Sequence, residues 1–426
     1  MNTLYNISIF IYRWMIFIAS FFNKKAKKWH EGRINVFSKF NNALREKPLI
    51  GIEKLIWFHC ASLGEFEQGR SLIEKWKREN VTWKILITFF SPSGYEIRKN
   101  YPLADFVFYL PADSKSNAAK FIRAFNPSIA IFVKYEFWFN YLNELRKKNI
   151  PTYLISANFR AGDHFFKWYG GWFRNMLKMF THVFVQNEIS ANLLKGLSLR
   201  NVSVSGDTRF DRVWATSKNA EEIPLAKRFK QNKKCLIAGS TWEADEKIIS
   251  AAFRGDRVSD LKLIIAPHEI HEDRINSVVQ TFSSFKTLRF SKANDQNIFD
   301  AEVLIIDNIG MLSRLYLHGD IAFVGGAFGN SLHNILEPAA FGLPVIFGPN
   351  HQKFWEGKAL IEKGGAFDIC NAEDLKDKIN FLLRDEMILK IASEMSRNFV
   401  RSNTGATEKI MEEILREISD LRKSGE

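Results

Sequence analysis

The sequence has little cysteine, and its cysteines are not spaced to form a bridge or a metal site. Cys60, Cys235 and Cys370 are the three cysteines in 426 residues, and no Cys-x-x-Cys pair occurs. An odd number of scattered thiols argues against a disulfide framework and against a structural zinc site built on cysteine, and it favours a reducing compartment. We therefore expect all three cysteines to be buried small apolar residues.

Several loops that commonly bind phosphate, metal or nucleic acid are absent as well. No Gly-x-Gly-x-x-Gly follows the first apolar run, and residues 326–331 (GAFGNS) do not form a Walker A loop. His268, Glu269 and His271 lack the spacing of the His-Glu-x-x-His zinc motif. No helix-turn-helix, zinc-finger or RNA-binding signature occurs, and there is no internal repeat. The sequence therefore argues against nucleotide binding through these two glycine motifs, and no metal is expected.

Positive charge is in excess, and it is concentrated near the N-terminus. The chain has 60 Lys and Arg against 47 Asp and Glu, a net charge of +13, and its first 50 residues hold nine Lys/Arg and two Glu. Such a balance suits nucleic acid, an anionic membrane or an anionic substrate. Its position beside an apolar stretch favours the membrane.

That apolar stretch is residues 4–22 (LYNISIFIYRWMIFIASFF), and the basic residues 24–28 (KKAKK) follow it directly. As a helix it would be roughly 28 Å long, about the thickness of the hydrocarbon core of a bilayer. A signal peptide carries its positive charge before the apolar run, so this order predicts an uncleaved anchor with a cytoplasmic basic flank. Arg13 leaves open whether the segment spans the bilayer or lies in its interface, and a buried core helix is the alternative.

Beyond residue 50 the pattern alternates between short apolar runs and amphipathic stretches. The runs are rich in Ile, Val and Phe, as expected for strands buried on both faces of a parallel sheet. Two series of runs are separated by polar residues, which predicts two doubly wound, Rossmann-like α/β domains that face each other across a cleft. The predicted parts are residues 1–28 (membrane anchor and basic flank), 29–212 (N-terminal domain), 213–233 (interdomain linker) and 234–426 (C-terminal domain with the last helices).

A single carboxylate, Glu65, follows the turn between the first apolar run and the next helical pattern (residues 59–70, HCASLGEFEQGR). The helix dipole favours a negative charge in the first turn of a helix, and this alone accounts for an acid here. Alternatively, the carboxylate lies at the rim of a cleft and takes a proton from a substrate hydroxyl.

Two stretches of the second half have the composition of a phosphate-binding site. Residues 238–246 (AGSTWEADE) place Ser240 and Thr241 before a helix, where they would contact a ligand or simply cap the helix. Residues 264–274 (IIAPHEIHEDR) end a strand at Pro267 and place His268 at its tip, as a candidate phosphate donor.

A third stretch, residues 324–349 (VGGAFGNSLHNILEPAAFGLPVIFGP), carries the most information. A strand should end in Gly325-Gly326, and a helix should open near His333-Asn334 and stop around Gly342. A helix N-terminus approached by small residues binds anionic phosphate. Glu337, expected one turn inside, would accept hydrogen bonds from ribose hydroxyls or would be an ordinary surface carboxylate.

Taken in order, the N-terminal apolar helix and the stretches HCASLGEFEQ, GDTRFDRV, AGSTWEADE and LEPAAFG with its flanks resemble the bacterial 3-deoxy-D-manno-octulosonic acid (Kdo) transferases. The resemblance covers essentially the whole chain. Members of this family are membrane-associated glycosyltransferases of the GT-B fold that act in lipopolysaccharide assembly. Other GT-B enzymes share a similar glycine-and-glutamate helix, so that part alone would identify only the superfamily.

The resemblance implies an inverting CMP-Kdo:lipid A precursor Kdo transferase on the cytoplasmic face of the cell inner membrane. CMP-Kdo would be its co-substrate, a lipid A precursor its acceptor and inner-membrane lipids its partners, with no nucleic acid, metal or other cofactor. Glu65 falls on the family's Ser-x-Gly-Glu motif, whose Glu is the proposed general base. The resemblance also assigns nine residues to CMP-binding segments: Pro267, His268, Ile309, Gly310, Met311, Asn334, Ile335, Leu336 and Glu337. Secondary candidates are Ser240, Thr241, Arg209 and Glu136.

The sequence departs from the family pattern in places. The family often has Arg-His after the strand-ending proline, where this chain has His268-Glu269, and it often has ETELWPN at residues 134–140, where this chain has KYEFWFN. Two other functions remain open: a GT-B transferase or epimerase that uses a UDP-sugar, and a basic, membrane-tethered nucleic-acid-binding protein. The leading interpretation requires Glu65 to face the helix that contains Glu337 across an interdomain gap.

Overall fold

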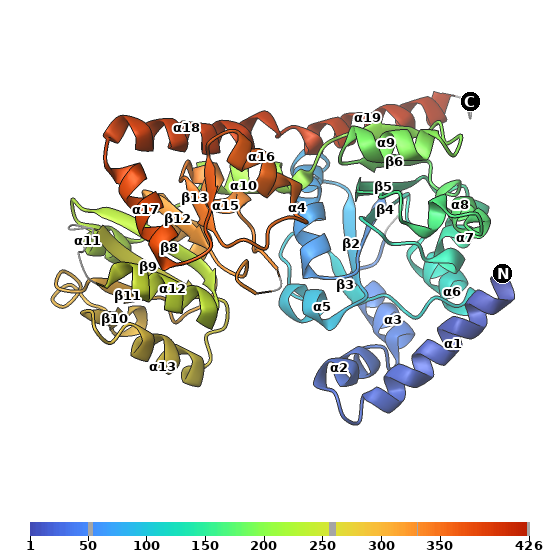
Figure 1. The fold of residues 1–426 in the computed structure, drawn as a ribbon. Helices are drawn as coiled ribbons and strands as arrows, with labels where there is room; N and C mark the ends of the chain where they lie inside the picture. The colour runs from blue at the N-terminus through green and yellow to red at the C-terminus, as the bar shows by residue number, and fades with distance from the viewer. Residues whose placement is uncertain (50–53, 255–260, 330, 424–426) are drawn as a thin grey trace. The chain divides into compact units, whose positions relative to one another are not determined.

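The computed structural model describes residues 1–49, 54–254, 261–329 and 331–423. The chain forms two compact units, one made of Met1–Arg212 with Gly405–Glu426 and the other of Val213–Thr404. Figure 1 labels their helices and strands. Asn330, which belongs to the loop predicted after Gly326, lies outside the described residues.

The first unit has a seven-stranded parallel sheet in the order β3-β2-β1-β4-β5-β6-β7. Alternate residues of β1 belong to two cores: Trp57 packs on one face of the sheet, and Ile56 and Phe58 pack on the other. Both faces are therefore covered, as predicted. The strands are β1 (Leu55–Cys60), β2 (Lys84–Phe89), β3 (Phe106–Tyr109), β4 (Ile129–Val133), β5 (Thr152–Ala157), β6 (His182–Val185) and β7 (Val202–Val204). The helices among and after these strands are α4 (Leu63–Glu79), α5 (Pro92–Arg98), α6 (Lys115–Phe125), α7 (Phe139–Lys147), α8 (Gly171–Leu177), α9 (Glu188–Lys195) and α10 (Thr208–Lys218), with a 3₁₀ turn at His164–Phe166.

The second unit repeats this plan, with a seven-stranded parallel sheet in the order β10-β11-β9-β8-β12-β13-β14. Its strands are β8 (Lys234–Thr241), β9 (Leu261–Pro267), β10 (Thr287–Arg289), β11 (Val303–Ile305), β12 (Ile321–Val324), β13 (Val345–Phe347) and β14 (Ala366–Asp368). Its helices are α11 (Pro224–Lys230), α12 (Glu243–Phe253), α13 (Glu272–Thr281), α14 (Leu312–Leu315), α15 (Leu336–Phe341), α16 (Trp355–Glu362), α17 (Ala372–Leu383) and α18 (Glu386–Ser402), with 3₁₀ turns at Phe290–Lys292 and Tyr316–His318. Two Rossmann-like units are therefore present, as the apolar runs predicted.

Three helices precede the first strand: α1 (Asn2–Ala19), α2 (Lys24–Gly32) and α3 (Val36–Glu46). The apolar stretch does not continue as one helix to residue 22, because the side chain of Asn23 accepts the backbone N–H groups of Lys25 and Ala26 at 2.8 and 3.0 Å and starts α2. Over the described residues, no helix combines the length and the apolarity that crossing a bilayer requires.

The last helix, α19 (Ala406–Lys423), belongs to the first unit, so the prediction that residues 234–426 form one domain is wrong. Ile410, Met411 and Ile414 of α19 are buried in the core that Phe58 and Phe184 also enter. The apolar stripe of this helix therefore finds its partner on the first unit, beside β6 and α9 (Figure 1).

Residues 213–233 do not form a free linker, because they contain the end of α10 and all of α11. Ile223, Ala226 and Phe229 are buried in a core of the second unit, and the backbone N–H of Ile223 donates to Nε2 of His318 at 3.0 Å. This segment belongs to the second unit from Val213 onward.

The cysteines are free, as predicted, but they are not all buried. Cys60 and Cys235 lie in the cores, whereas Cys370 is exposed. Cys370 lies in the turn between β14 and α17, where its backbone N–H donates to Asp374 at 2.8 Å and its side chain faces outward.

Candidate functional site

In the first unit the strand order reverses between β1 and β4. Ligands of open α/β sheets bind in the crevice at the carboxyl ends of the strands at such a switch point. Glu65 follows β1 and Glu136 follows β4, so the sheet brings these two predicted residues to the same edge. Burial, reinforced by the charges of Glu65 and Glu136, raises the pKa of the Cys60 thiol, which places both carboxylates near the end of β1.

Glu65 lies in the first turn of α4, partly exposed, and accepts a hydrogen bond from the hydroxyl of Ser62. The helix packs closely on the sheet: a Cβ on Gly69 would lie 3.1 Å from the side chain of Val133 on β4. This close approach fixes the start of α4 against the switch point, so both sequence interpretations of Glu65 are compatible with its position.

Glu136 belongs to a buried polar network that sequence reasoning missed. Its Oε2 accepts the indole N–H of Trp138 at 2.6 Å and lies 3.1 Å from Nε2 of His59. Nδ1 of His59 lies 2.9 Å from the hydroxyl of Thr88, which in turn accepts the indole N–H of Trp57 at 2.7 Å. A polar chain thus runs from the core to the switch point, and it holds the Glu136 carboxylate in a fixed orientation.

Two residues at the carboxyl edge of the first sheet have strained backbone conformations. Lys134, directly after β4, has a φ of 72°, and Ser156 at the end of β5 has a φ of 55°. Non-glycine residues in the left-handed region cost about 1–3 kcal/mol each and cluster at functional sites. Backbone strain is therefore present at the carboxyl edge of this sheet, close to Glu136.

Arg209, a secondary candidate, lies away from this switch point, after the edge strand β7. Its guanidinium pairs with the buried carboxylate of Asp207 at 2.7–2.8 Å. The adjacent Thr208 donates to the backbone of Gln68 on α4 at 2.6 Å. Arg209 therefore has a clear structural role at the start of α10.

In the second unit the strand order reverses between β8 and β12. Asp245, the third residue of α12, joins the two loops at this switch point, because its Oδ2 accepts the backbone N–H groups of Trp242 at 2.8 Å and Gly326 at 2.9 Å. The loops touch closely: a Cβ on Gly325 would lie 2.5 Å from the carbonyl oxygen of Ser240. Glycine at position 325 is therefore required by this approach.

Three aromatic rings lie together at this edge, one after each of β8, β9 and β12. The rings of Trp242 and His268 are 4.7 Å apart between centroids, and those of His268 and His333 are stacked at 4.4 Å. The indole N–H of Trp242 donates to Nε2 of His333 at 2.9 Å. Burial, with a smaller contribution from His268, lowers the pKa of His333, so its imidazole stays neutral at pH 7.

Of the two alternatives left open for Ser240 and Thr241, contact with a ligand or capping of the helix, the structure excludes capping. The N-cap of α12 is Trp242, whose N–H is held by Asp245. Thr241 is buried and donates to Glu246 at 2.8 Å, whereas Ser240 has a φ of 53° and remains partly exposed. Of these two candidates, only Ser240 is accessible to a ligand.

The helix predicted near His333-Asn334 begins at Leu336, with Ile335 as its N-cap, and Oδ1 of Asn334 accepts the N–H of Leu336 at 3.1 Å. The helix ends at Gly342, as predicted, with a φ of 82°. Glu337 lies in the first turn and not one turn inside, and it accepts from Nδ2 of Asn334 at 3.1 Å. Ile335 and Leu336 are buried, so their side chains face the core.

The remaining predicted positions lie on the same edge of the second sheet. Pro267 is the last residue of β9, and the N–H of His268 donates to the backbone of Thr241 at 3.0 Å. Ile309, Gly310 and Met311 follow β11, and the side chain of Ile309 is 87% exposed. Sequence reasoning missed Trp242 and Asp245, although both lie in the stretch AGSTWEADE that it singled out.

The chain matches the family model of 3-deoxy-D-manno-octulosonic-acid transferase (kdotransferase) over residues 29–212. A 3-deoxy-D-manno-octulosonic acid transferase of Rickettsia felis is 28% identical over 378 residues, which are 86% of this chain and 79% of that protein. A transferase of the same name from Aquifex aeolicus is 29% identical over 348 residues, 80% of this chain and 89% of that protein.

Solved structures are similar in fold. UDP-GlcNAc 2-epimerase from Neisseria meningitidis, bound to UDP-GlcNAc, gives a TM-score of 0.61 at 16% identity and covers 86% of this chain and all of that one (100%). A glycosyltransferase from Rickettsia africae gives 0.58 at 16% identity, with 86% and 99% covered. At this identity the likeness concerns the fold alone, and it identifies the pair of Rossmann-like units as a GT-B fold.

Proposed function

We propose that this chain, which is similar in sequence to the Kdo transferases of lipopolysaccharide biosynthesis, is a glycosyltransferase of that family and transfers Kdo from CMP-Kdo to a lipid A precursor with inversion at the anomeric carbon. The observation that carries the proposal is the placement of the candidate residues: apart from Arg209, they lie at or near the carboxyl ends of the strands, and Glu65, Glu136, Ser240 and Thr241 lie at or just after the ends of strands that flank a switch point. The acceptor site would be in the first unit and the donor site in the second. The predicted position of Glu65 opposite Glu337 stays a prediction.

In the first unit, Glu65 would act as general base. A carboxylate at the start of a helix is stabilised as an anion by the helix dipole, and it remains ready to accept a proton from the attacking sugar hydroxyl. A positioned base contributes about 10²–10⁴-fold to the rate. The buried Glu136 network would orient the acceptor beside it.

In the second unit, the rings of Trp242, His268 and His333 would bind the CMP group. Flat rings in a stack offer a surface for a nucleobase, and the imidazole of His268, partly free of protein contacts on its exposed side, can donate to the phosphate. The open loop at Ile309–Met311 and the amides near Asn334 would complete the site. No metal is needed for this proposal.

We also propose that the enzyme binds the inner membrane through α1, which would lie in the interface. Within α1 no side chain is buried, and Leu4, Phe10, Trp14 and Met15 are each more than half exposed. Exposed lysines of α2 follow directly, and such a combination attracts anionic bilayers. A cavity of about 720 Å³ beside α1, lined by Phe10, Trp14 and Arg13, is suited to contact lipid.

A direct test is a transfer assay with enzymatically generated CMP-Kdo and a defined lipid A precursor, with product mass as the readout. Wild-type protein should add Kdo, and Glu65→Gln should lower the rate about 10²–10⁴-fold while CMP still binds. Glu79→Gln, at the other end of the same helix, is the matched control and should retain wild-type turnover. Near-normal turnover of Glu65→Gln would exclude the base role.

The donor is tested separately by competition between CMP and UDP. CMP should displace a bound fluorescent CMP analogue, and UDP should displace it much less effectively. Preferential binding of UDP would favour the UDP-sugar alternative. Sedimentation with anionic vesicles tests α1: replacing Phe10 and Trp14 by serine should lower membrane recovery and leave CMP binding unchanged, whereas unchanged recovery would contradict the interface helix.

A further inference from the structure

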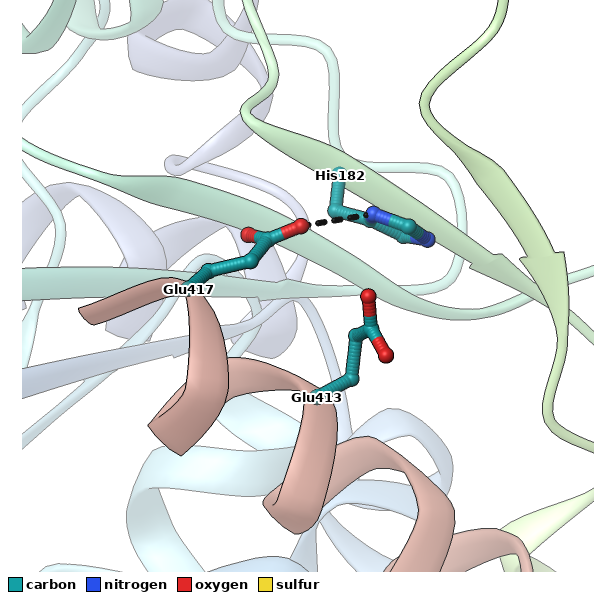
Figure 2. Close-up of side chains that lie close together, drawn as sticks. All are labelled: His182, Glu413 and Glu417. Atoms are coloured by element: carbon teal, nitrogen blue, oxygen red, sulfur yellow. Dashed lines mark hydrogen bonds and ion pairs between the residues drawn. The ribbon is translucent and has the colours of Figure 1, made fainter. Parts of the chain in front are cut away.

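His182, Glu413 and Glu417 form a cluster in the first unit that the proposed transfer does not use. His182 is the first residue of β6, and the two glutamates lie one turn apart on the same face of α19 (Figure 2). One ligand atom from each residue lies within 4.8 Å of the others. Nδ1 of His182 is already 2.9 Å from Oε1 of Glu417.

A second observation indicates that the cluster is incomplete as it stands. The side chain of Tyr153 is fully buried, and neither its hydroxyl nor Oε2 of Glu417 has a hydrogen-bond partner among the described residues. Tyr153 lies directly opposite His182 in the register of β5 and β6. Tyr153 also belongs to the same core as Ile410, Met411 and Ile414 of α19, so its side chain lies on the face of the sheet that α19 covers. Buried polar groups without partners are uncommon and call for an explanation.

We propose that His182, Glu413 and Glu417 bind a divalent transition-metal ion, with Zn²⁺ as the representative ion. One imidazole and two carboxylates are a ligand set suited to such an ion, and two negative charges balance its charge. Nδ1 would bind the ion, and Nε2–H would then donate to the hydroxyl of Ser203, 2.9 Å away, as ligand histidines usually do with their second nitrogen. A water in the fourth position would lie within reach of the Tyr153 hydroxyl.

The geometry requires a small adjustment. Ligand atoms around a tetrahedral Zn²⁺ lie about 3.4 Å apart, so the widest separation in the cluster must shrink by roughly 1.4 Å. Glu413 can make this movement because its present partner, Arg416, is an exposed side chain on the same helix. Glu417 and His182 need little movement, since they are already in contact.

The position of the cluster shows what the ion would do. His182 begins β6, so the cluster lies at the amino ends of the strands, whereas Glu65 follows the carboxyl end of β1. The ion would therefore fasten α19 to the sheet without taking part in the transfer. Binding to the folded state alone stabilises a protein by mass action, so the docking of this terminal helix would depend on the metal.

The test measures Zn²⁺ binding by the full-length protein. After treatment with a chelator, wild-type protein dialysed against ZnCl₂ should retain one equivalent of Zn²⁺, and its thermal midpoint should rise. Glu417→Gln and His182→Gln should bind Zn²⁺ at least about 10-fold more weakly and lose the rise. Glu412→Gln, which changes the neighbouring carboxylate outside the cluster, is the matched control and should behave as wild type.

Glu413→Gln keeps the test decisive if the other two variants unfold. Glu413 pairs with the exposed Arg416 on its own helix, so this variant should fold normally and still lose the Zn²⁺-dependent rise in midpoint. Equal Zn²⁺ binding by Glu413→Gln and wild type, or no binding by wild type, would overturn the proposal. Neither result bears on Kdo transfer, which is measured separately.

Discussion

Asp245 offers the sharpest test of how the donor site is built. Its carboxylate is 1% exposed and accepts two backbone N–H groups, those of Trp242 and Gly326, from loops that follow different strands. In Asp245→Ala the N–H of Gly326 remains buried and loses its acceptor, whereas that of Trp242 is only partly buried. A buried donor left unpaired costs about 1–3 kcal/mol, so the second unit should lose about 1–4 kcal/mol of its free energy of unfolding.

In Asp245→Ala the two loops should lose their structure first, before the second unit unfolds as a whole. Without Asp245, the loops after β8 and β12 are no longer held together, so Trp242 and His333 lose their fixed positions and CMP should bind more weakly. Amide hydrogen exchange by mass spectrometry should speed up at residues 325–326 and 242–245, and strands of the first unit should be unaffected. Calorimetric titration with CMP gives the affinity on the same samples.

Asp374→Ala is the matched control, because Asp374 also accepts a backbone N–H in the second unit, that of Cys370 at 2.8 Å, but at an exposed site. Water can replace this acceptor, so we expect a loss of about 1 kcal/mol or less and unchanged affinity for CMP. If Asp245→Ala loses no more stability than Asp374→Ala, or binds CMP as tightly as wild type, then Asp245 does not organise the donor site and the reasoning is refuted.

Three further changes test the first unit. Burial raises the pKa of Asp113 to about 6 from 3.8, so the folded state binds a proton more tightly than the unfolded state. Relative to Asp113→Asn, the stability of the wild-type protein in urea unfolding should therefore fall by up to about 3 kcal/mol as pH rises from 4 to 7. The same pH dependence in wild type and Asp113→Asn would contradict this. The guanidinium of Arg33 donates to three backbone carbonyls, and Arg33→Lys should therefore lower the thermal midpoint through a loss of about 2–4 kcal/mol, whereas an unchanged midpoint would show that these bonds are dispensable. Trp138→Phe removes the 2.6 Å donor of Glu136 and should lower the transfer rate about 10-fold with unchanged CMP affinity; unchanged rates would remove the Glu136 network from acceptor binding.

The sequence predicted the sheets better than it predicted the ends of the chain. The runs of Ile, Val and Phe identify strands because burial on both faces leaves a direct mark on composition. The location of α19 leaves no such mark, since its apolar stripe at Ile410, Met411 and Ile414 would fit either unit. Which unit it joins depends on contacts between residues far apart in sequence, such as Asp211, whose carboxylate accepts the N–H groups of Gly405 and Thr407 at 2.6 and 2.7 Å.

The candidate site was predictable to a similar extent. Glu65 and His268 could be identified because each follows a strand, where parallel sheets bind ligands. The buried partner of Glu136, His59, could not, since a histidine within an apolar run carries no sign of its contacts. Residue preference left Ser240 and Thr241 as possible caps of α12, but the N-cap is Trp242, whose N–H donates to Asp245. Tertiary contacts overrode the local preference.

In the proposed transfer the two units would use the same topology for different chemistry, because different side chains lie at the carboxyl ends of their strands. At the first switch point these side chains are carboxylates, Glu65 and Glu136, which suit proton acceptance and the binding of hydroxyl groups. At the second they are the rings of Trp242, His268 and His333, with the pKa of His333 lowered by burial so that its ring stays neutral. Flat rings of this kind can stack on a nucleobase. A transferase needs one unit to activate the acceptor and the other to hold the nucleotide, and the division of residue types between the two sheets matches that need.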